Sequence, residues 1–288
     1  MLFRSLEALN QTRKILTYLP PNSSTKAPTL LVEQSNNLRN AKLLNIIPND
    51  ERYAYDMHDL LRLIVDKNSL LELKAGFDGS LITTLASIDG KVVGILANNP
   101  KVTAGAMGPG ACDKAVAMIT LCDSYNIPLI FIHDTPGFFV SKRAEEQKMP
   151  IKIMNFIKAM HLATVPKISL IVRKSYGMAH CNMLGANMGA DFLLAWPNAQ
   201  IGFMAPEVAM NVVLGRKLAT SPNPEAMKTA FLEEMANLNA PWQAAERNFI
   251  NRIIDPRDTR KELSICLKFA CTPQKSISQH KLANWPRL

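Results

Sequence analysis

Two hydrophobic periods alternate along this chain of 288 residues. Short apolar runs between turn residues predict buried strands, at Leu70–Leu73, Leu81–Ser87, Val92–Ala97, Leu129–Ile132, Ile168–Val172 and Phe192–Ala195. Apolar residues repeated on one helical face predict helices, at Tyr55–Asp66, from Ala111 until Asn126, at Ile151–Leu162, about Ala179–Met188, Pro206–Leu214, Asn223–Asn237, Trp242–Phe249 and Thr259–Phe269. Strands alternating with helices indicate an α/β fold with largely parallel strands.

Three local signals mark the ends of these elements. Asp56 is placed to cap the first of the predicted helices that follow residue 50. Asp78-Gly79 and Asp89-Gly90 are turn signals of the hairpin kind, and they flank the two strands predicted between residues 81 and 97. The first two paired strands are therefore expected to be joined by tight turns.

The stretch Ile168–Asp191 joins a predicted strand to a predicted helix through a glycine turn. The apolar run ends at Arg173 and Lys174, and Tyr176-Gly177 forms the turn. The first turn of a helix has backbone N–H groups without intrahelical partners, and the helix dipole is positive there. Such a position is able to bind an oxyanion. The alternative is that Gly177 serves only as a tight turn, as in many α/β domains.

A second candidate position follows the strand predicted to end at Ile132. His133 and Asp134 come directly after it, and strand ends are where α/β sheets bind ligands. A His-Asp pair is able to act as an acid/base couple. However, adjacent strand residues point to opposite faces, which prevents joint action on one atom. The next residues, Pro136-Gly137, are better explained as a loop whose backbone lies close to a ligand.

Common catalytic and nucleotide-binding motifs are absent from the sequence. There is no GxSxG, HExxH or GxxxxGK[ST] segment. Gly105, Gly108 and Gly110 form a glycine-rich loop after a strand, but their order is not the dinucleotide fingerprint. This loop alone is weak evidence for nucleotide binding.

Composition narrows the function classes further. Hydrophobic residues make up 48%, enough for a sizeable core, and no apolar stretch reaches the length of a membrane span. The net charge is +9, but Lys and Arg are scattered without interleaved aromatic residues, so a nucleic-acid partner is not expected. No CxxC pair is present, so a metal site is not indicated, and the cysteines are expected to be reduced thiols; they are Cys112, Cys122, Cys181, Cys266 and Cys271.

Several motifs in a fixed order resemble one enzyme family. They are RKSYGMAHCNM at 173–183, TPGF at 135–138 and AWPNAQIGFM at 195–204, with agreeing segments from about Ile47 to about Arg260. Together they resemble the C-terminal half of the carboxyltransferase (beta) subunit of biotin-dependent acyl-CoA carboxylases, of the propionyl-, acetyl- and methylcrotonyl-CoA carboxylase type. The resemblance implies a crotonase-type fold, a spiral of β-β-α units, which periodicity alone does not separate from a doubly wound sheet.

The resemblance also divides the chain. Residues 1–37 are similar to the last helix and linker of a preceding domain, 38–271 to the crotonase-like C-terminal domain, and 272–288 are expected to form a tail. An alternative for the N-terminus is a mitochondrial transit peptide, because Arg4, Arg13 and Lys14 accompany only one acid before residue 20. The resemblance favours the first interpretation, in which the chain is a half-subunit.

The family's reaction moves a carboxyl group between carboxybiotin and the α-carbon of a short-chain acyl-CoA. The resemblance therefore implies biotin as the cofactor, acyl-CoA as the substrate, and a basic chain suited to the polyanion coenzyme A. It implies as partners a biotin carboxyl carrier protein, biotin carboxylase, an N-terminal carboxyltransferase half and further copies in a homo- or hetero-oligomer. The implied location is the cytoplasm, or the mitochondrial matrix if the source is eukaryotic.

The resemblance assigns individual residues to the site. The backbone N–H groups of Met178 and Ala179, after Gly177, match a pair that stabilises an oxyanion. Because catalysis then depends on these placed donors, the site needs no strong acid or base. The segment Thr135, Pro136, Gly137, Phe138 matches the loop that lines the biotin side. Tyr176, His180 and Cys181 match positions beside substrate or biotin, although Cys181 is equally explained as a small buried apolar residue.

Two departures from the family pattern leave alternatives open. The family usually has glycine at position 178, 179 or both, whereas here both residues carry side chains. SKRAEEQK at 141–148 also differs from the usual pattern after TPGF. Alternatives to the carboxyltransferase are therefore a non-catalytic assembly partner, a fragment of a longer subunit, and a biotin-dependent acyl-CoA decarboxylase subunit that runs the transfer in reverse.

Overall fold

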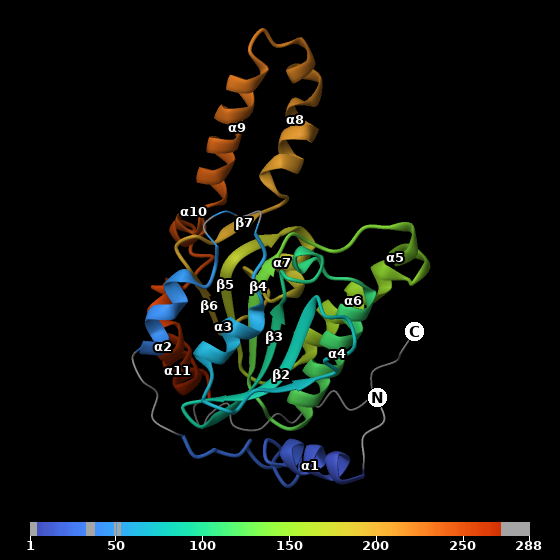
Figure 1. The fold of residues 1–288 in the computed structure, drawn as a ribbon, viewed down its shortest axis with the longest axis vertical. Helices are drawn as coiled ribbons and strands as arrows, with labels where there is room; N and C mark the ends of the chain where they lie inside the picture. The colour runs from blue at the N-terminus through green and yellow to red at the C-terminus, as the bar shows by residue number, and fades with distance from the viewer. Residues whose placement is uncertain (1–4, 33–37, 49, 51–52, 272–288) are drawn as a thin grey trace.

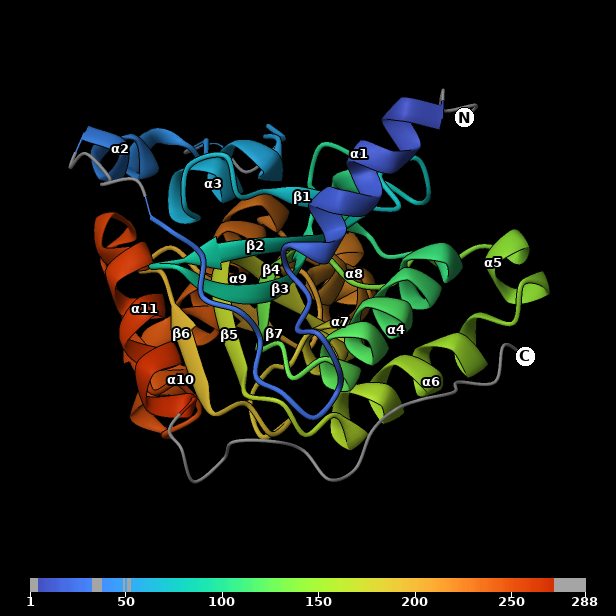
Figure 2. The same cartoon turned by 90° about the horizontal axis from the view of Figure 1, so that it is seen from below.

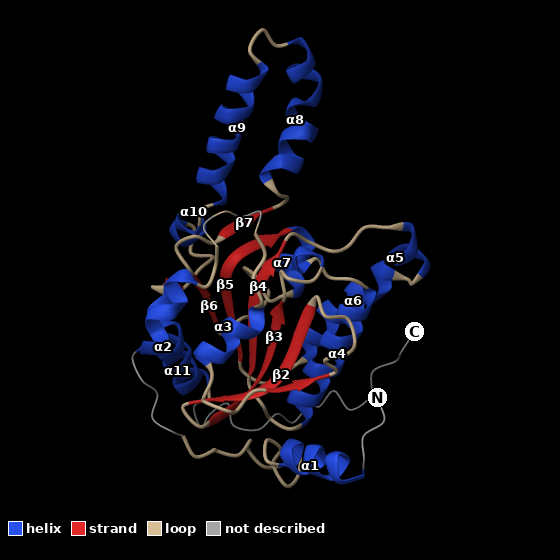
Figure 3. Ribbon diagram, viewed as in Figure 1, coloured by secondary structure: helices blue, strands red, loops and turns tan. Residues whose placement is uncertain are grey.

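A central sheet organises the part of the chain that the computed structural model describes, which is residues 5–32, 38–48, 50 and 53–271 (Figure 1). Within this part the sheet has eight strands, in the order β1-β2-β3-β4-β5-β6-β8, with β7 paired to β5 (Figure 3). The strands are β1 (Leu71–Leu73), β2 (Leu81–Ile88), β3 (Lys91–Asn98), β4 (Leu129–Thr135), β5 (Lys167–Tyr176), β6 (Phe192–Ala195), β7 (Gln200–Gly202) and β8 (Arg252–Ile253).

The pairing changes once across this sheet, from antiparallel to parallel. β1, β2 and β3 pair antiparallel, whereas β3, β4, β5, β6 and β8 run parallel and β7 is parallel to β5. The prediction of a mostly parallel α/β sheet is confirmed. Asp89-Gly90 forms the tight turn between β2 and β3, with φ of 49° and 77°. Asp78-Gly79 lies in the longer connection 74–80 between the antiparallel strands β1 and β2.

Helices cover both faces of the sheet (Figure 2). One face packs α4 and α6, and the other packs α3 and α11. The helices are α1 (Ser5–Leu16), α2 (Leu38–Ala41), α3 (Met57–Ile64), α4 (Pro109–Ser124), α5 (Lys142–Glu146), α6 (Met149–Leu162), α7 (Gly177–Asn182), α8 (Pro206–Thr220), α9 (Pro224–Asn239), α10 (Pro241–Glu246) and α11 (Thr259–Ala270), with 3₁₀ turns η1 (Lys42–Asn45), η2 (Thr103–Gly105) and η3 (Pro256–Asp258).

The strand sequences explain these two layers. Alternate residues of β2 and β4, such as Leu85 and Phe131, pack into the core under α4 and α6. Their neighbours Ala86 and Ile130 pack into the core under α3 and α11. Because both faces are covered, the strands read as continuous apolar runs rather than alternating ones.

Helices α8 and α9 form a hairpin that projects away from the sheet (Figure 1). Pro206 and Pro224 occupy the first turns, and the Asn223 side chain accepts a hydrogen bond from the Ala226 amide at 3.2 Å. At its base Gly202 packs against Asn239, and a Cβ at Gly202 would lie 2.6 Å from the Asn239 Oδ1. Gly202 therefore permits the close approach of α9 to β7.

Two elements near the candidate site differ in length from their predictions. The strand predicted to end at Val172 continues to Tyr176, because the polar residues beyond Val172 pair with β7 and with side chains of β4. The helix predicted for about 179–188 ends at Asn182, since Leu184 and Asn187 adopt left-handed φ of 69° and 61°. These φ values are incompatible with a continuing right-handed helix.

No helix of the described residues has both the length and the apolar character needed to span a membrane. The predicted tail 272–288 lies outside the described residues.

Candidate functional site

The turn from β5 into α7 is the centre of the candidate site. Gly177 begins α7 with φ of 58°, a left-handed conformation that favours glycine. A Cβ at this position would lie 3.0 Å from the Phe203 carbonyl oxygen, so close approach of the chain after β7 also favours glycine. The next two amides, of Met178 and Ala179, belong to the first helical turn and have no intrahelical partner. Both donors follow the carboxyl end of a parallel strand.

The two side chains at this turn face different surroundings. The Ala179 side chain is fully buried in the core under α4 and α6, whereas Met178 is 48% exposed. The Tyr176 side chain is buried, and its hydroxyl donates a hydrogen bond to the Gln200 Oε1 on β7. The Met178 side chain thus stands beside the amides rather than underneath them.

The segment Thr135–Phe138 follows the carboxyl end of β4, the strand next to β5. The Thr135 hydroxyl lies 3.2 Å from the Gly137 amide and 3.1 Å from the Gly137 carbonyl, which closes a tight loop. Gly137 has φ of 139°, and no atom lies within 4 Å of the position its Cβ would take. Its backbone is therefore accessible on that side.

The glycine-rich loop at 105–110 supports this segment. Met107 forms an isolated bridge with Phe138, with hydrogen bonds from the Met107 amide to the Gly137 carbonyl at 3.1 Å and from the Phe139 amide to the Met107 carbonyl at 2.9 Å. A Cβ at Gly105 would collide with the Asp134 carbonyl oxygen. These contacts give the loop a structural partner within the described chain.

His133 and Asp134 point to opposite faces of β4, which confirms the prediction from strand alternation. The pairing of β4 with β5 is irregular at this point. His133 pairs with Ile171, but Thr135 pairs with Ser175, so β5 has the longer path between these pairs. Such bulges re-aim side chains of the bulged strand near functional sites.

On the α3 side of the sheet, Asp134 forms a buried ion pair with Arg173. The Arg173 Nε donates to the Asp134 Oδ2 at 2.9 Å, and the Lys174 amide donates to the Oδ1 at 3.3 Å. The Arg173 guanidinium also lies 5.1 Å from the centre of the Tyr55 ring. Burial raises the pKa of Asp134, although the Arg173 charge opposes that shift. Burial and the Asp134 charge raise the pKa of Tyr55 well above its usual value.

On the opposite face, His133 and His180 are joined through Ser175. The Ser175 hydroxyl lies 2.7 Å from the His133 Nδ1 and 2.8 Å from the His180 Nδ1. The Ala186 amide donates to the His180 Nε2 at 2.9 Å, and the His133 Nε2 lies 2.7 Å from the Ser169 hydroxyl. All four ring nitrogens are therefore engaged within the chain.

Burial determines the protonation of both histidines. It lowers the pKa of His133 well below the usual value, and the neighbouring His180 lowers it further. Burial also lowers the pKa of His180, to about 4. Both rings are consequently neutral at neutral pH, and neither supplies a fixed positive charge beneath the Met178 and Ala179 amides.

Comparison with known protein families covers nearly the whole chain. The family model described as Carboxyl transferase domain matches residues 3–284. This chain belongs to the carboxyl transferase domain family.

Relatives of this carboxyl transferase domain support the assignment. The Methylmalonyl-CoA carboxyltransferase 12S subunit of Propionibacterium freudenreichii subsp. shermanii is 36% identical over 95% of this chain and 52% of its own length. The Methylmalonyl-CoA decarboxylase subunit alpha of Propionigenium modestum is 34% identical over 96% of this chain and 54% of its own length. This chain thus spans about half the length of these curated relatives.

Solved structures agree with the fold of the carboxyl transferase domain. A crystal structure of transcarboxylase 12S, described as a hexamer with methylmalonyl-coenzyme A and methylmalonic acid bound, superimposes with a TM-score of 0.89. It is 34% identical and covers 98% of this chain and 54% of the solved chain. The crotonase-type fold implied by the sequence is confirmed.

Cys181 lies one residue after His180 on α7 of the carboxyl transferase domain. Its side chain is half-buried, and burial raises the pKa of its thiol. A thiol with a raised pKa is a poor nucleophile, because the thiolate is the reactive form. The geometry therefore gives Cys181 a packing environment and no activating partner.

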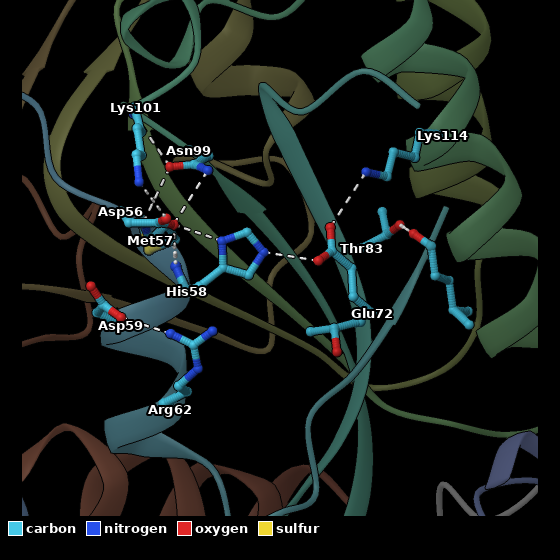
Figure 4. Close-up of polar contacts among 12 residues, drawn as sticks. Asp56, Met57, His58, Asp59, Arg62, Glu72, Thr83, Asn99, Lys101 and Lys114 are labelled. Atoms are coloured by element: carbon cyan, nitrogen blue, oxygen red, sulfur yellow. Dashed lines mark hydrogen bonds and ion pairs between the residues drawn. The ribbon is translucent and has the colours of Figure 1, made fainter. Parts of the chain in front are cut away.

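A second polar cluster in the carboxyl transferase domain was not predicted from the sequence (Figure 4). His58, at the start of α3, lies between two carboxylates, with its Nδ1 2.6 Å from the Asp56 Oδ1 and its Nε2 2.9 Å from the Glu72 Oε2. Lys114 points toward Glu72 from α4, with its Nζ 3.9 Å from the Oε1. Asp56 and His58 are two residues apart, but Glu72 and Lys114 come from other segments of the chain, so no local pattern reveals the cluster.

Charge coupling shifts the pKa values in this cluster. Hydrogen bonding to Glu72 raises the pKa of His58, and the bond to Asp56 adds to that effect. Burial alone would raise the pKa of Asp56, but hydrogen bonds from His58 outweigh it and lower the pKa to about 2. Burial lowers the pKa of Lys114, whose amine has no hydrogen-bond partner among the described residues. Asp56 also caps α3 as predicted, accepting from the His58 amide at 3.1 Å.

Proposed function

We propose that this chain is the biotin-side domain of an acyl-CoA carboxyltransferase. The observation that carries the proposal is the β5–α7 turn. Gly177 presents the Met178 and Ala179 amides beyond the carboxyl end of a parallel strand, beside the Thr135–Phe138 loop. This arrangement supplies two fixed donors without a strong acid or base. The names of the relatives, a carboxyltransferase and a decarboxylase of methylmalonyl-CoA, support the same chemistry.

The described residues fit a cofactor that presents an oxyanion. Carboxybiotin would supply the carboxyl group when bound, and its ureido oxygen would be the oxyanion at this turn. The Met178 and Ala179 amides would donate to that oxyanion, and the positive end of the helix dipole would add to the stabilisation. The neutral state of His133 and His180 leaves this role to the amides. Tyr176, His180 and Cys181 surround the turn from within the fold.

The division of the chain proposed from the resemblance has a consequence for activity. We propose that residues 38–271 form the C-terminal domain, that 1–37 are a remnant of a preceding domain with its linker, and that 272–288 are a tail. On this division the acyl-CoA is held mainly by an N-terminal carboxyltransferase half. Residues 38–271 without that half are then inactive. Its other partners would be a biotin carboxyl carrier protein and biotin carboxylase, in an oligomer located in the cytoplasm or mitochondrial matrix.

Carboxyl transfer from methylmalonyl-CoA to a free biotin derivative tests this function. The assay is run on the chain alone and then with an added N-terminal carboxyltransferase half. Transfer in the mixture only is the expected result. Full transfer by the purified chain alone would contradict the proposed need for an N-terminal half. No transfer in either sample, with the chain folded and bound to its partner, would contradict the proposed enzymatic function.

A matched pair of variants tests whether the Met178 backbone amide is an oxyanion donor. Met178→Pro removes one backbone N–H at a position in the first helical turn, where proline is tolerated, whereas Met178→Ala keeps it. Loss of one oxyanion donor typically costs about 10²–10³ in rate. We expect that loss for the proline variant and no loss for the alanine variant, which keeps the amide. A folded proline variant with unchanged transfer would exclude this amide as a donor.

A non-catalytic assembly role is the second candidate. The projecting hairpin of α8 and α9 favours it, because Val212 and Val213 are 72% and 56% exposed there. On this alternative the fold serves oligomerisation, and Met178 marks a site that no longer binds an oxyanion. Intact association with partners, combined with no transfer under any condition, would support it.

A further inference from the structure

Several buried polar groups have no direct part in the proposed reaction. The described residues contain no group of three or more His, Cys, Asp or Glu side chains placed to hold a metal ion. The chain Ala186–His180–Ser175–His133–Ser169, hereafter the relay, is buried or half-buried throughout and lies directly under the β5–α7 turn.

The relay has one consistent direction when the Ser175 hydroxyl both accepts and donates a hydrogen bond within it. A backbone amide only donates, so the His180 Nε2 must accept from Ala186 and carry no proton. The neutral His180 ring then carries its proton on Nδ1 and donates it to the Ser175 hydroxyl. Ser175 in turn donates to the His133 Nδ1, and the His133 Nε2–H donates to Ser169. The two histidines therefore have opposite tautomers.

The relay spans the residues that carry the candidate donors. Ser175 lies at the end of β5 and His180 lies in α7, so their hydrogen bond of 2.8 Å closes a loop around residues 176–179. His180 also binds the segment after α7, through the Ala186 amide at 2.9 Å and through its own carbonyl, which accepts from the Gly185 amide at 2.8 Å. A Cβ at Gly185 would collide with the His180 ring. The ring is thus fixed on both edges.

From this geometry we infer that His180, Ser175 and His133 are positioning residues, which hold the Met178 and Ala179 amides in place through a one-directional relay of hydrogen bonds. The inference rests on the proposed function of those amides. Buried polar networks are costly unless every member is satisfied, and when satisfied they specify one conformation. Small misplacements in an active site can lower rates by about 10²-fold, so the relay would act on the rate of the chemical step rather than on binding.

Two variants at position 180 separate positioning from packing. His180→Asn keeps a side-chain N–H at the place of Nδ1 and so can still donate to Ser175, whereas His180→Phe removes every polar atom. We expect a fall in kcat of about tenfold to hundredfold for the phenylalanine variant, with KM nearly unchanged, and partial rescue in the asparagine variant. His161→Asn, at an exposed position on α6, serves as the matched control and is expected to leave kcat and KM unchanged.

Nitrogen NMR on the chain alone tests the relay without any assay of activity. Labelled wild-type protein is expected to show His180 as the Nδ1–H tautomer and His133 as the Nε2–H tautomer, with a His180 pKa of about 4 and a His133 pKa well below the usual value. Ser175→Ala is expected to shift the amide signals of Met178 and Ala179. Identical tautomers in the two histidines, or unshifted amides in Ser175→Ala, would overturn the relay.

The kinetic and NMR measurements distinguish a failure of the positioning role from a failure of the proposed function. If the wild type performs transfer with its N-terminal partner but His180→Phe retains its kcat, the positioning role is wrong and the proposed function stands. If the wild type performs no transfer while Ser175→Ala shifts both amides, the proposed function fails and the relay still positions the turn. Restored kcat in His180→Asn relative to His180→Phe supports the inference directly.

Discussion

Replacing Asp134 by asparagine should destabilise the fold strongly, because it leaves the buried Arg173 guanidinium without a counter-charge. The Asp134 side chain is fully buried and Arg173 is only 7% exposed. Both carboxylate oxygens act as acceptors, one for the Arg173 Nε at 2.9 Å and one for the Lys174 amide at 3.3 Å. Asparagine has a single side-chain acceptor oxygen, so one of these donors would face its NH₂ group.

The expected size of this effect follows from the burial of the pair. Breaking a buried ion pair by removing one partner costs about 3–5 kcal/mol. At about 2–4 °C of Tm per kcal/mol for a protein of this size, the melting temperature should fall by roughly 6–20 °C. Removing both charges, in Asp134→Leu with Arg173→Met, should recover much of that loss, since an apolar pair often replaces a buried ion pair without a large cost.

Equilibrium unfolding in urea, followed by circular dichroism, measures these free energies. Asp59→Asn is the matched control, because Asp59 also pairs with an arginine, Arg62 at 2.7 Å, but both side chains are more than 60% exposed. Its free energy of unfolding should change by less than about 1 kcal/mol. An Asp134→Asn protein as stable as the Asp59→Asn protein would refute the argument that this pair holds the ends of β4 and β5 together.

Three further predictions concern single residues. Met178→Gly should raise the rate of carboxyl transfer in the presence of an N-terminal half by opening the approach to the amides, while lowering stability by about 1 kcal/mol; unchanged transfer would favour the assembly role. Gly177→Ala should destabilise by about 1–2 kcal/mol because of its left-handed φ, whereas Gly215→Ala, in α8 with no atom within 4 Å of its Cβ position, should stabilise by about 0.5–1 kcal/mol; urea unfolding that ranks them otherwise would contradict this. The folded pKa of His58 is raised above its unfolded value, so its stabilising contribution is fully present below the unfolded pKa and is lost as pH rises through the folded pKa. The wild type should therefore exceed His58→Gln in stability by more at about pH 5.5 than at about pH 8.5.

Hydrophobic periodicity revealed the sheet and most helices because the core depends on local patterns. The strand Ile168–Val172 was evident from its apolar run, but its extension to Tyr176 was not, since those residues are polar and their partners lie on β4 and β7. The short length of α7 was missed for a related reason. The left-handed residues Leu184 and Asn187 that follow it carry no glycine or proline signal of their own.

The candidate site was predictable where it depends on backbone, and not where it depends on distant side chains. Gly177 and the TPGF segment each predicted a turn from the local sequence alone. Alternation along a strand was enough to place His133 and Asp134 on opposite faces, and the structure confirms it. In contrast, the bond between His133 and Ser175 joins residues 42 apart, and the pair of His58 and Glu72 joins residues 14 apart. Such contacts are created by the fold, so no single segment encodes them.

The separation of His133 from Asp134 across β4 has a consequence for how substitutions combine. These two residues are neighbours in the chain, yet each belongs to a different network, one of neutral hydrogen bonds and one of buried charge. Energetic coupling requires shared partners. Substitutions at 133 and 134 should therefore act almost independently, whereas His133 and Ser175 should be strongly coupled. In this domain strand β4 separates the two networks. The coupling between substitutions therefore depends on which face of the sheet each side chain occupies, rather than on how close the residues are in the sequence.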